Sequence, residues 1–370
     1  MPLVDYGTIG RRIADARGRA GLTQEELARA IGLDRSALAK IETGIRRVTA
    51  LELARIVDQT GERFEWFVRE PSAAVHSYRS GTGSTTTSSI DRMLEQIARD
   101  VALVQSLQGI DVAPIEPYPQ PKTPAEAAHL AQEARRLLRL PQPGPIIDLV
   151  TPLADLGLFA FSADLGADAP DAATTLLHPG GVSVINSDRA VGRRRLALAH
   201  ALGHYLLADE YTIDWRVGVE LHDQDREYLL DVFARALLLP AESLIQRWKK
   251  LTDTESLRTA AVRITSEYRV DMSTLAARLA DLNLAEEDEL DRIRTFRTTR
   301  ADIIEHDLVV THDLAGTTLP RRYEKAVLAL YRAERISPEC AIDLLQGTID
   351  ESGLPDLPPA HENEIWKFIS

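Results

Sequence analysis

Apolar residues spaced three and four positions apart predict that much of this chain is helical. Residues 6–69 show the pattern most clearly, as short apolar-faced segments separated by tight turns. In the first segment, Ile9, Ile13, Ala16 and Ala20 fall on one face of a helix. We therefore predict a small helical bundle at the start of the chain.

Two of these predicted helices carry clear N-terminal signals. Thr23 and Glu26 have the spacing of a capping box, in which the hydroxyl accepts the Glu26 amide and the carboxylate reaches back. Gly32 ends that helix, and Asp34 can cap the next one, which runs to about Thr43. Two short helices joined by a turn with glycine form a helix-turn-helix arrangement.

The outer face of the second helix is short, polar and basic, because Arg35, Ser36, Ala37 and Lys40 are left facing outward. Arginine can contact guanine in two places, and lysine or serine can contact bases or phosphates. Gln24, at the start of the preceding helix, can donate to a phosphate where the helix dipole also helps. These five residues are predicted to contact double-stranded DNA; the alternative is a bundle used for protein contacts or dimerisation.

The pattern changes after this bundle. Residues 71–90 are rich in Ser, Thr and Gly, which predicts a flexible linker. Strands are expected at Leu158–Ser162 and Val182–Asn186. Further helices are expected near 91–108, 124–139, 191–208 and 225–238, two within 254–283, and near 321–334 and 337–346.

These elements predict a mainly α protein with a small β-sheet, of the α+β class. The first part is a five-helix bundle, the middle combines helices with the strands, and the C-terminal region is helical. Four segments are expected, at 1–70, 71–123, 124–285 and 286–370. They are a DNA-binding domain, a linker with one helix, a domain of helices and strands, and a regulatory or partner-binding region.

Charge divides the 370-residue chain, whose net charge is −13. Residues 1–70 hold 12 Lys+Arg against 11 Asp+Glu, whereas the remainder holds 31 against 45, a net charge of −14. The first segment could therefore bind DNA, whereas the rest would repel it. The alternative is that this imbalance is ordinary variation, and charge alone does not decide between the two. The chain contains no run of about 18 apolar residues, so no membrane span is predicted. The single Cys340 and the absence of a signal-like apolar start are consistent with the cytoplasm.

Two histidines four residues apart suggest a metal site. His200 and His204 share one face of a predicted helix and could both reach one zinc ion. A mononuclear zinc site needs a third protein ligand and an open position. The next long helix offers Glu227, with Asp231 one turn later.

Two segments resemble known families. The stretch "LTQEELARAIGLDRSALAKIETGIRRVT" resembles XRE helix-turn-helix domains, a family in which Gln24 and the face at 35–40 would approach DNA and Glu42 would be structural. The stretches "SVINSDRAVGRRRLALAHALGHYLL", "EYLLDVFARALLLP" and "YRVDMSTLAARLADLNL" together resemble the ImmA/IrrE metallopeptidase-like domain. That resemblance implies that residues 124–285 form a zincin-like, degenerate metallopeptidase domain. It also implies a gluzincin arrangement, with Glu227 as third zinc ligand and Asp231 orienting a histidine.

Ala201 departs from the metallopeptidase pattern, because His-Glu-x-x-His enzymes carry a glutamate there as general base. Three interpretations compete: a natural pseudo-peptidase that keeps its pocket, a peptidase whose glutamate has been replaced, and two core histidines bonded to backbone carbonyls without a metal. Asp209, Glu210, Glu220 and Asp223 could supply another base, but nothing in the sequence places one by the metal.

The two resemblances together imply a homodimeric DNA-binding regulator whose second domain senses a signal or binds a protein partner, without a membrane role. One alternative is a zinc endopeptidase that cleaves a repressor. Another is the antitoxin of a toxin–antitoxin pair, whose acidic C-terminal part would bind the toxin.

Overall fold

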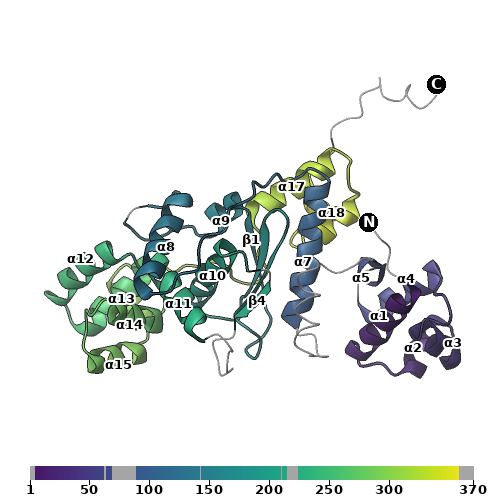
Figure 1. Ribbon diagram of the computed structural model, residues 1–370, viewed down its shortest axis with the longest axis horizontal. Coiled ribbons are helices and arrows are strands. Elements are labelled where there is room, and N and C mark those ends of the chain that lie inside the picture. Colours follow the sequence, from purple (N-terminus) through teal and green to yellow (C-terminus); the bar gives the residue numbers. More distant parts are fainter. Residues whose placement is uncertain are drawn as a thin grey trace, which may run out of the picture. The chain divides into compact units, whose positions relative to one another are not determined.

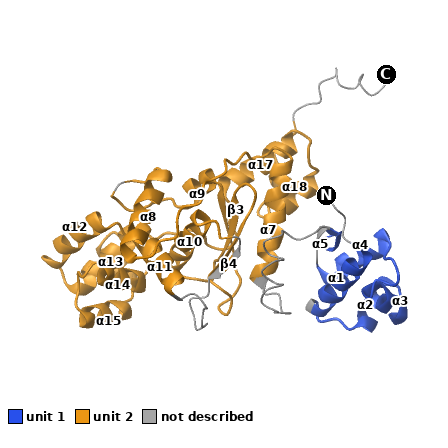
Figure 2. Cartoon of the chain, viewed as in Figure 1, with its two compact units in different colours: residues 1–76 blue, residues 77–370 orange. Residues whose placement is uncertain are grey.

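The computed structural model divides the chain into two compact units, residues 1–76 and residues 77–370 (Figure 2). The described residues are 5–61, 64–68, 89–141, 143–209, 211–214 and 224–357. Residues 71–88, the greater part of the predicted linker, lie outside this set. Within the described residues, no helix combines the length and apolar character that crossing a membrane requires.

Unit 1 is a bundle of short helices around its own apolar core (Figure 1). The helices are α1 (Tyr6–Arg19), α2 (Gln24–Ile31), α3 (Arg35–Glu42), α4 (Ala50–Thr60) and α5 (Phe64–Val68). Ile13, Leu27, Leu38, Ile56 and Phe67 are fully buried in that core, one from each helix. The predicted bundle is therefore confirmed.

Local capping explains where the central helices of unit 1 begin and end. The Thr23 hydroxyl accepts the Glu26 amide at 3.2 Å, and the Glu26 carboxylate accepts the Thr23 amide at 2.7 Å, which confirms the predicted capping box. Gly32 ends α2 in the left-handed region, with φ of 77°. Asp34 caps α3 by accepting the Ala37 amide at 2.8 Å.

The first helix ends one residue earlier than its sequence pattern predicts. The sequence places Ala20 on the helix face of Ile13 and Ala16, but α1 ends at Arg19 and Ala20 is its C-cap. Ile13 and Ala16 are fully buried, whereas Ala20 is exposed. The periodicity does not show where the buried part of the face ends.

Unit 2 is built on a mixed four-stranded sheet in the order β1-β3-β2-β4. The strands are β1 (Leu158–Ala163), β2 (Ala172–Leu176), β3 (Gly181–Asn186) and β4 (Tyr211–Asp214). β1 runs parallel to β3, and β2 runs antiparallel to both β3 and β4. The strands at 158 and 182 confirm the prediction, whereas β2 and β4 were not predicted.

Alternating side chains send the two faces of the sheet into two different cores. In β1, Leu158 and Ala160 join one apolar cluster, while Phe159 and Phe161 join the other. The first cluster holds the helix α10 (Val191–Leu206), and the second holds α7 (Ser89–Ser106). Figure 1 shows α10 and α7 on opposite sides of the strands.

The remaining helices extend these two cores. On the α10 side lie α8 (Pro124–Leu137), α11 (Gln224–Leu238), α12 (Ala241–Thr252), α13 (Leu257–Tyr268), α14 (Met272–Asp281) and α15 (Glu287–Thr295). On the α7 side lie α17 (Arg321–Arg332) and α18 (Pro338–Leu344). The helix α9 (Val150–Leu156) contacts β1, and α16 (Arg300–Glu305) and a short 3-10 turn (Glu351–Gly353) complete the described elements.

The architecture confirms the predicted fold class, a mainly helical protein with a small sheet. The predicted domain boundaries stay a prediction. In unit 2, α7 from the predicted linker region and α17 from the predicted C-terminal region share a core with the sheet. Helices α9, α12, α15 and α16 were not predicted from the sequence.

Candidate metal centre and nucleic-acid interface

The histidine helix α10 is almost completely buried, and charged groups fix its N-terminal end. Arg189 and Arg193 each donate to Asp171 at 2.6 Å, and that carboxylate is 1% exposed. The fully buried Arg195 pairs with Asp313. The pairs with Asp171 hold the start of α10 against the loop between β1 and β2, and the pair with Asp313 holds it against the segment between α16 and α17. These contacts fix the position of α10, and His200 lies about one and a half turns after Arg195 on that helix.

The carboxylate helix α11 is held at its other end by two buried arginines. Arg135 donates to the Leu237 carbonyl at 2.5 Å, and Arg278 donates to the Leu239 carbonyl at 3.0 Å. Burial lowers the pKa of both guanidinium groups to about 10, yet both stay charged at neutral pH. They satisfy carbonyls that the last turn of a helix leaves without partners.

A glycine brings α10 and α11 close together. A Cβ at Gly203 would lie 2.8 Å from Leu230 and 3.1 Å from Phe233, both on α11. The absence of a side chain at this position, directly before His204, therefore allows the two helices to approach. This approach brings the ligand atoms of both helices within reach of one another.

Three ligand atoms converge between the helices. The Nε2 atom of His200 lies 3.0 Å from Nε2 of His204 and 3.0 Å from Oε2 of Glu227. The Nε2 atom of His204 lies 3.7 Å from the same carboxylate oxygen. The structure thus places together the three residues that the sequence predicts as ligands. That they bind a metal stays a prediction.

A carboxylate lies behind each imidazole. The Nδ1 atom of His200 lies 2.9 Å from Asp231, the residue predicted for that role. The Nδ1 atom of His204 lies 2.7 Å from Asp209, which also accepts a hydrogen bond from Arg226. From the sequence, Asp209 is only a candidate base, and nothing points to Arg226. The missed signal is local, because Asp209 lies in the turn after α10, separated from the last helical residue, Leu206, only by Leu207 and Ala208.

The electrostatics keep the acids of the site ionised. Burial raises the pKa of Glu227, but the hydrogen bond with His200 and the nearby imidazole of His204 outweigh it and hold that pKa well below its usual range. For Asp209, burial likewise raises the pKa, and the bonds with His204 and Arg226 bring the net pKa below the usual value. Both groups are therefore carboxylates at neutral pH.

This donor set fits a divalent cation. A cation would replace the proton between His200 and Glu227. In the tautomer in which each Nδ1–H donates to its carboxylate, both Nε2 atoms have a lone pair, and two nitrogens and one oxygen can then bind a cation at a common point. Zinc bonds of about 2.0–2.2 Å in a tetrahedral arrangement place ligand atoms about 3.3 Å apart, close to the observed spacings. This hydrogen-bonded group contains three carboxylates, from Asp209, Glu227 and Asp231, and one guanidinium, from Arg226. With neutral imidazoles the group has an excess of two negative charges, which a divalent cation would balance.

No general base is present at position 201. Ala201 is 3% exposed and carries only a methyl group. Asp209 contacts the Nδ1 side of His204, away from the converging Nε2 atoms. Glu210, Glu220 and Asp223 lie outside the described residues. The described part of the site can therefore hold a cation but offers no carboxylate in the place of the peptidase glutamate.

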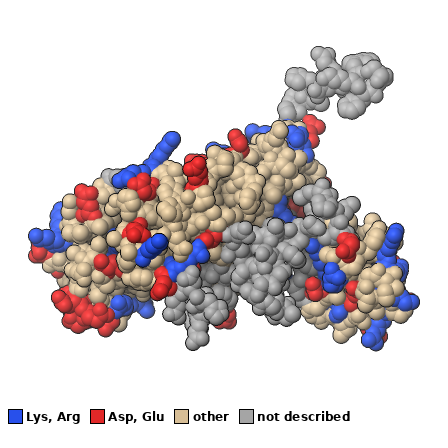
Figure 3. Space-filling model, viewed as in Figure 1, with Lys and Arg blue, Asp and Glu red and all other residues tan. Residues whose placement is uncertain are grey.

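The predicted DNA-contacting face lies on α3. Arg35, Ser36 and Lys40 are exposed and Ala37 is half-buried. Figure 3 shows basic side chains on the surface of unit 1 in this region. Ser36 donates to Asp34 at 2.7 Å, so part of its hydrogen-bonding capacity is used by the cap. The side chains remain accessible to a groove, and their contact with DNA stays a prediction.

Gln24 is held by a buried ion pair. Its amide donates to Glu42 at 2.7 Å, and Arg17 donates to the other oxygen of that carboxylate at 2.6 Å. Glu42 is 7% exposed, so the pair joins α1, α2 and α3 from inside. This bond orients Gln24 at the N-terminal end of α2.

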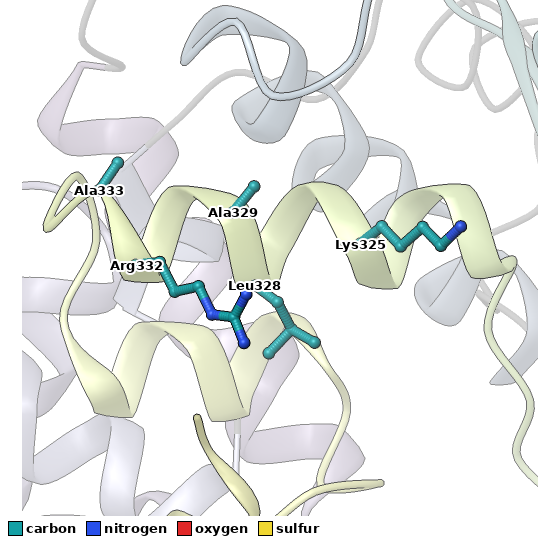
Figure 4. A pocket seen from close by; sticks show the side chains of 5 residues that line it. All are labelled: Lys325, Leu328, Ala329, Arg332 and Ala333. Atoms are coloured by element: carbon teal, nitrogen blue, oxygen red, sulfur yellow. The ribbon is translucent and has the colours of Figure 1, made fainter. Parts of the chain in front are cut away.

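A surface pocket lies along α17 and its C-cap. It is lined by Lys325, Leu328, Ala329, Arg332 and Ala333 (Figure 4). Its side chains are two cations and small or branched apolar groups. No carboxylate, imidazole or thiol stands among these lining residues, so the pocket adds no candidate metal ligand.

The fold and the site define a helix-turn-helix unit joined to a metallopeptidase-like unit. Residues 13–67 match the "Helix-turn-helix" family model, and residues 154–280 match the "IrrE N-terminal-like domain" of the Peptidase M78 family. The chain therefore carries an XRE-type helix-turn-helix domain followed by an IrrE-like domain. This combination supports a DNA-binding regulator.

Other comparisons add little. No curated protein matches the chain significantly. Among solved structures, PlcR of Bacillus thuringiensis, in complex with the peptide PapR7 and DNA, is similar at 11% identity, covering 92% of this chain and 96% of that chain, with a TM-score of 0.18. ComR of Streptococcus suis is similar at 12% identity, with coverages of 94% and 96% and a TM-score of 0.17. Scores this low do not support a shared overall fold.

Proposed function

We propose that this protein is a homodimeric transcriptional regulator that binds double-stranded DNA through α3, with Gln24, Arg35, Ser36, Ala37 and Lys40 at the interface. The observation that carries the proposal is the exposed polar face of α3 in a segment that matches the helix-turn-helix family. The IrrE-like domain binds zinc and senses a signal or holds a protein partner, such as a repressor or toxin, without cleaving it.

The DNA proposal is tested by reversing the two cations of α3. The double variant Arg35→Glu/Lys40→Glu is compared with Lys249→Glu/Lys250→Glu on α12, which changes the net charge equally and leaves unit 1 intact. Binding to DNA from the protein's own promoter region is measured by fluorescence anisotropy at several salt concentrations. The α3 variant is expected to lose specific binding, because charge-assisted contacts become repulsive.

The α12 variant serves as the control for net charge and is expected to bind the same operator with an affinity within about threefold of the unsubstituted chain. Normal operator binding by the α3 variant would show that another surface recognises DNA. Equal losses in both variants would show that overall charge, and not α3, governs binding.

In the metal centre, Nε2 of His200, Nε2 of His204 and Oε2 of Glu227 would hold the ion. Bound zinc supplies a Lewis acid and positive charge, as structural and catalytic zinc sites do. Asp231 holds the ring of His200 through its Nδ1–H group. Ala201 leaves no carboxylate to take a proton from an attacking water, so we propose a binding and sensing role and not hydrolysis.

The metal proposal is tested by the zinc content of purified protein and by titration against a chromogenic chelator. One equivalent per chain is expected, with loss of binding in His200→Ala and Glu227→Ala. The matched control is His129→Ala, which removes an exposed histidine of α8. A zinc-free chain that also fails to bind added zinc would remove the metal from the proposal.

A further inference from the structure

We infer that Asp209, paired with Arg226, is a positioning residue of the metal centre that fixes the ring orientation and tautomer of His204. The inference rests on the proposed zinc-binding function and adds two residues to it. Its basis is a chain of contacts that runs from Arg226 through Asp209 to His204, on the side of the ring that faces away from the convergent ligand atoms.

The backbone turn that ends α10 delivers Asp209 to this place. Ala208 adopts a left-handed conformation with φ of 57°. The Asp209 amide then donates to the His204 carbonyl at 3.0 Å, and the Ala208 amide donates to the Tyr205 carbonyl at 3.2 Å. This is the Schellman pattern, which usually uses glycine at the left-handed position. An alanine there costs about 1 kcal/mol, so the turn is held by its surroundings.

Because the turn folds back on the last turn of α10, the Asp209 side chain reaches the histidine of its own helix. Its Oδ2 atom lies 2.7 Å from Nδ1 of His204, and both side chains are largely buried, at 14% and 5% exposure. A hydrogen bond of this kind between buried groups defines which ring nitrogen carries the proton. Nε2 of His204 is then left with a lone pair that points toward Glu227 and His200.

Arg226 links this contact to the opposite helix. It donates to the second oxygen of Asp209, and it directly precedes Glu227 on α11. The ion pair therefore ties the end of α10 to the start of α11, so the positions of one histidine and of the carboxylate ligand are set together. With Asp231 behind His200, each imidazole of the site has its own carboxylate.

The chemical consequence concerns the proton on His204. A neutral imidazole carries its proton on Nδ1 or on Nε2. Asp209 accepts from Nδ1–H and favours the form whose Nε2 atom is free to bind a cation. Without that acceptor, the ring can hold the proton on Nε2 or rotate, and both changes remove a ligand.

The test uses the full chain with the variants Asp209→Ala, Asp209→Asn and Arg226→Gln. The matched control is Arg235→Gln, which breaks another ion pair of α11, with Asp281, and does not touch the histidines. Zinc affinity is measured by competition with a chromogenic chelator. The tautomer of His204 in zinc-free protein is measured by long-range ¹⁵N–¹H NMR, which a purely structural role would not change.

Asp209→Ala is expected to weaken zinc binding about 10–100-fold, and Asp209→Asn, which keeps an acceptor, is expected to weaken it less. The zinc affinity of Arg226→Gln is expected to lie between those of the Asp209 variants and that of the control. The control, Arg235→Gln, is expected to bind zinc within about twofold of the unsubstituted chain. His204 is expected in the Nδ1–H form in the unsubstituted chain and as a mixture in Asp209→Ala. If Asp209→Ala does not fold, the zinc affinity and the His204 tautomer of Asp209→Asn and Arg226→Gln test the inference instead.

An Nε2–H form of His204 in the unsubstituted zinc-free chain would overturn the inference, and so would a zinc affinity of Asp209→Ala within twofold of normal. The failure of the proposed function has a different signature. In that case the unsubstituted chain binds no zinc, while the tautomer measurement still decides whether Asp209 positions the ring.

Discussion

At the scale of single residues, the most consequential position is Ala201. It directly follows His200, which the structure brings together with His204 and Glu227, the three candidate ligands. Among the described residues, the candidate site thus has ligands for a cation but lacks the carboxylate that would move protons in a peptidase.

We expect the zinc-loaded chain to hydrolyse unfolded protein substrates no faster than the background rate of the assay. Ala201→Glu is expected to raise chelator-sensitive hydrolysis about 10²–10⁴-fold above that background. The reason is that a glutamate would take a proton from the attacking water and return it to the leaving amine. Release of fluorescent peptides from a quenched, unfolded substrate measures the effect. Ala201→Gln is the control, because glutamine has nearly the same size as glutamate and cannot transfer the proton.

Turnover by the unsubstituted chain would contradict this prediction if chelators and His200→Ala both stopped it. Such a result would mean that another acid takes the role of the missing glutamate. Activity that chelators do not affect would instead indicate a contaminating peptidase.

At the scale of elements, close helix contacts decide how both units are built. In unit 1, a Cβ at Gly10 would lie 2.3 Å from the Ile41 carbonyl oxygen, so α1 and α3 touch through their backbones. In unit 2, a Cβ at Gly192 would lie 2.2 Å from the Asp271 amide, where α10 meets the start of α14. Small residues at these points set the positions of the candidate DNA-binding and metal-binding helices.

Gly10→Ala is expected to destabilise unit 1 by about 1–3 kcal/mol, because neither backbone can yield without moving a helix. The matched control lies on the same helix. A Cβ at Gly18 would have no neighbour within 4 Å, so Gly18→Ala is expected to stabilise the unit by about 0.5–1 kcal/mol. Urea unfolding of the full chain, followed by amide exchange in α1 and α3, measures both effects.

Opposite signs for the two alanine variants are the expected outcome. Destabilisation by both would mean that helix propensity does not govern the exposed position. A neutral Gly10→Ala would show that α1 and α3 do not approach as closely as described.

The helix caps of unit 1 predict an acid-dependent loss of stability. The backbone amide of Thr23 holds the pKa of Glu26 below its ordinary 4.5, and the Ser36 hydroxyl holds that of Asp34 below its ordinary 3.8. Since these folded-state pKa values are depressed, the stability is present above the ordinary values and is lost as pH falls through the folded values.

We therefore expect Glu26→Gln to reduce amide protection in α2 at pH 7 and to differ less from the unsubstituted chain near pH 3. Hydrogen exchange between those pH values checks the trend. Glu25→Gln is the control, because Glu25 pairs with Arg29 on the surface and makes none of the capping bonds. An effect of Glu26→Gln that stayed constant with pH would contradict the linkage.

At the scale of the whole molecule, each unit has a core of its own. The apolar cluster of unit 1 shares no residue with the two clusters of unit 2. The charge is divided in the same way, since all of the negative excess lies beyond residue 70. Figure 3 shows acidic side chains gathered over α15 of unit 2. One chain thus combines a near-neutral helix-turn-helix unit with an acidic one.

Separate cores predict two thermal transitions, and zinc is expected to raise only that of unit 2. At a free zinc concentration 100 times the dissociation constant, unit 2 should gain about 2.7 kcal/mol, and a chelator should reverse the gain. Differential scanning calorimetry of the full chain measures the transitions. Gly10→Ala identifies the transition of unit 1, because this substitution should lower the transition temperature of unit 1 and leave that of unit 2 unchanged.

A single cooperative transition that zinc raises as a whole would contradict this prediction. It would show that the two units stabilise each other. A zinc effect that persists in His200→Ala would place the ion elsewhere.

Much of the protein could be predicted from the sequence because the relevant interactions are local. Helix periodicity, the capping box of Thr23 and Glu26, and the four-residue spacing of His200 and His204 depend on residues within two turns of each other. The prediction of Glu227 and Asp231 as site residues rests on a family resemblance, and in the structure both contact His200. Local periodicity also extends the first helix to Ala20, because it does not register where a helix ends.

Only the tertiary structure decided the rest, because those interactions join distant or irregular segments. The short strands β2 and β4 form because β3 and β2 supply partners for their backbone groups, and neither has an apolar alternation strong enough to be recognised alone. The shared core of α7, α17 and the sheet depends on which faces meet, which periodicity does not specify. Asp209 reaches His204 through a left-handed turn at a non-glycine residue, a conformation that the surrounding packing imposes.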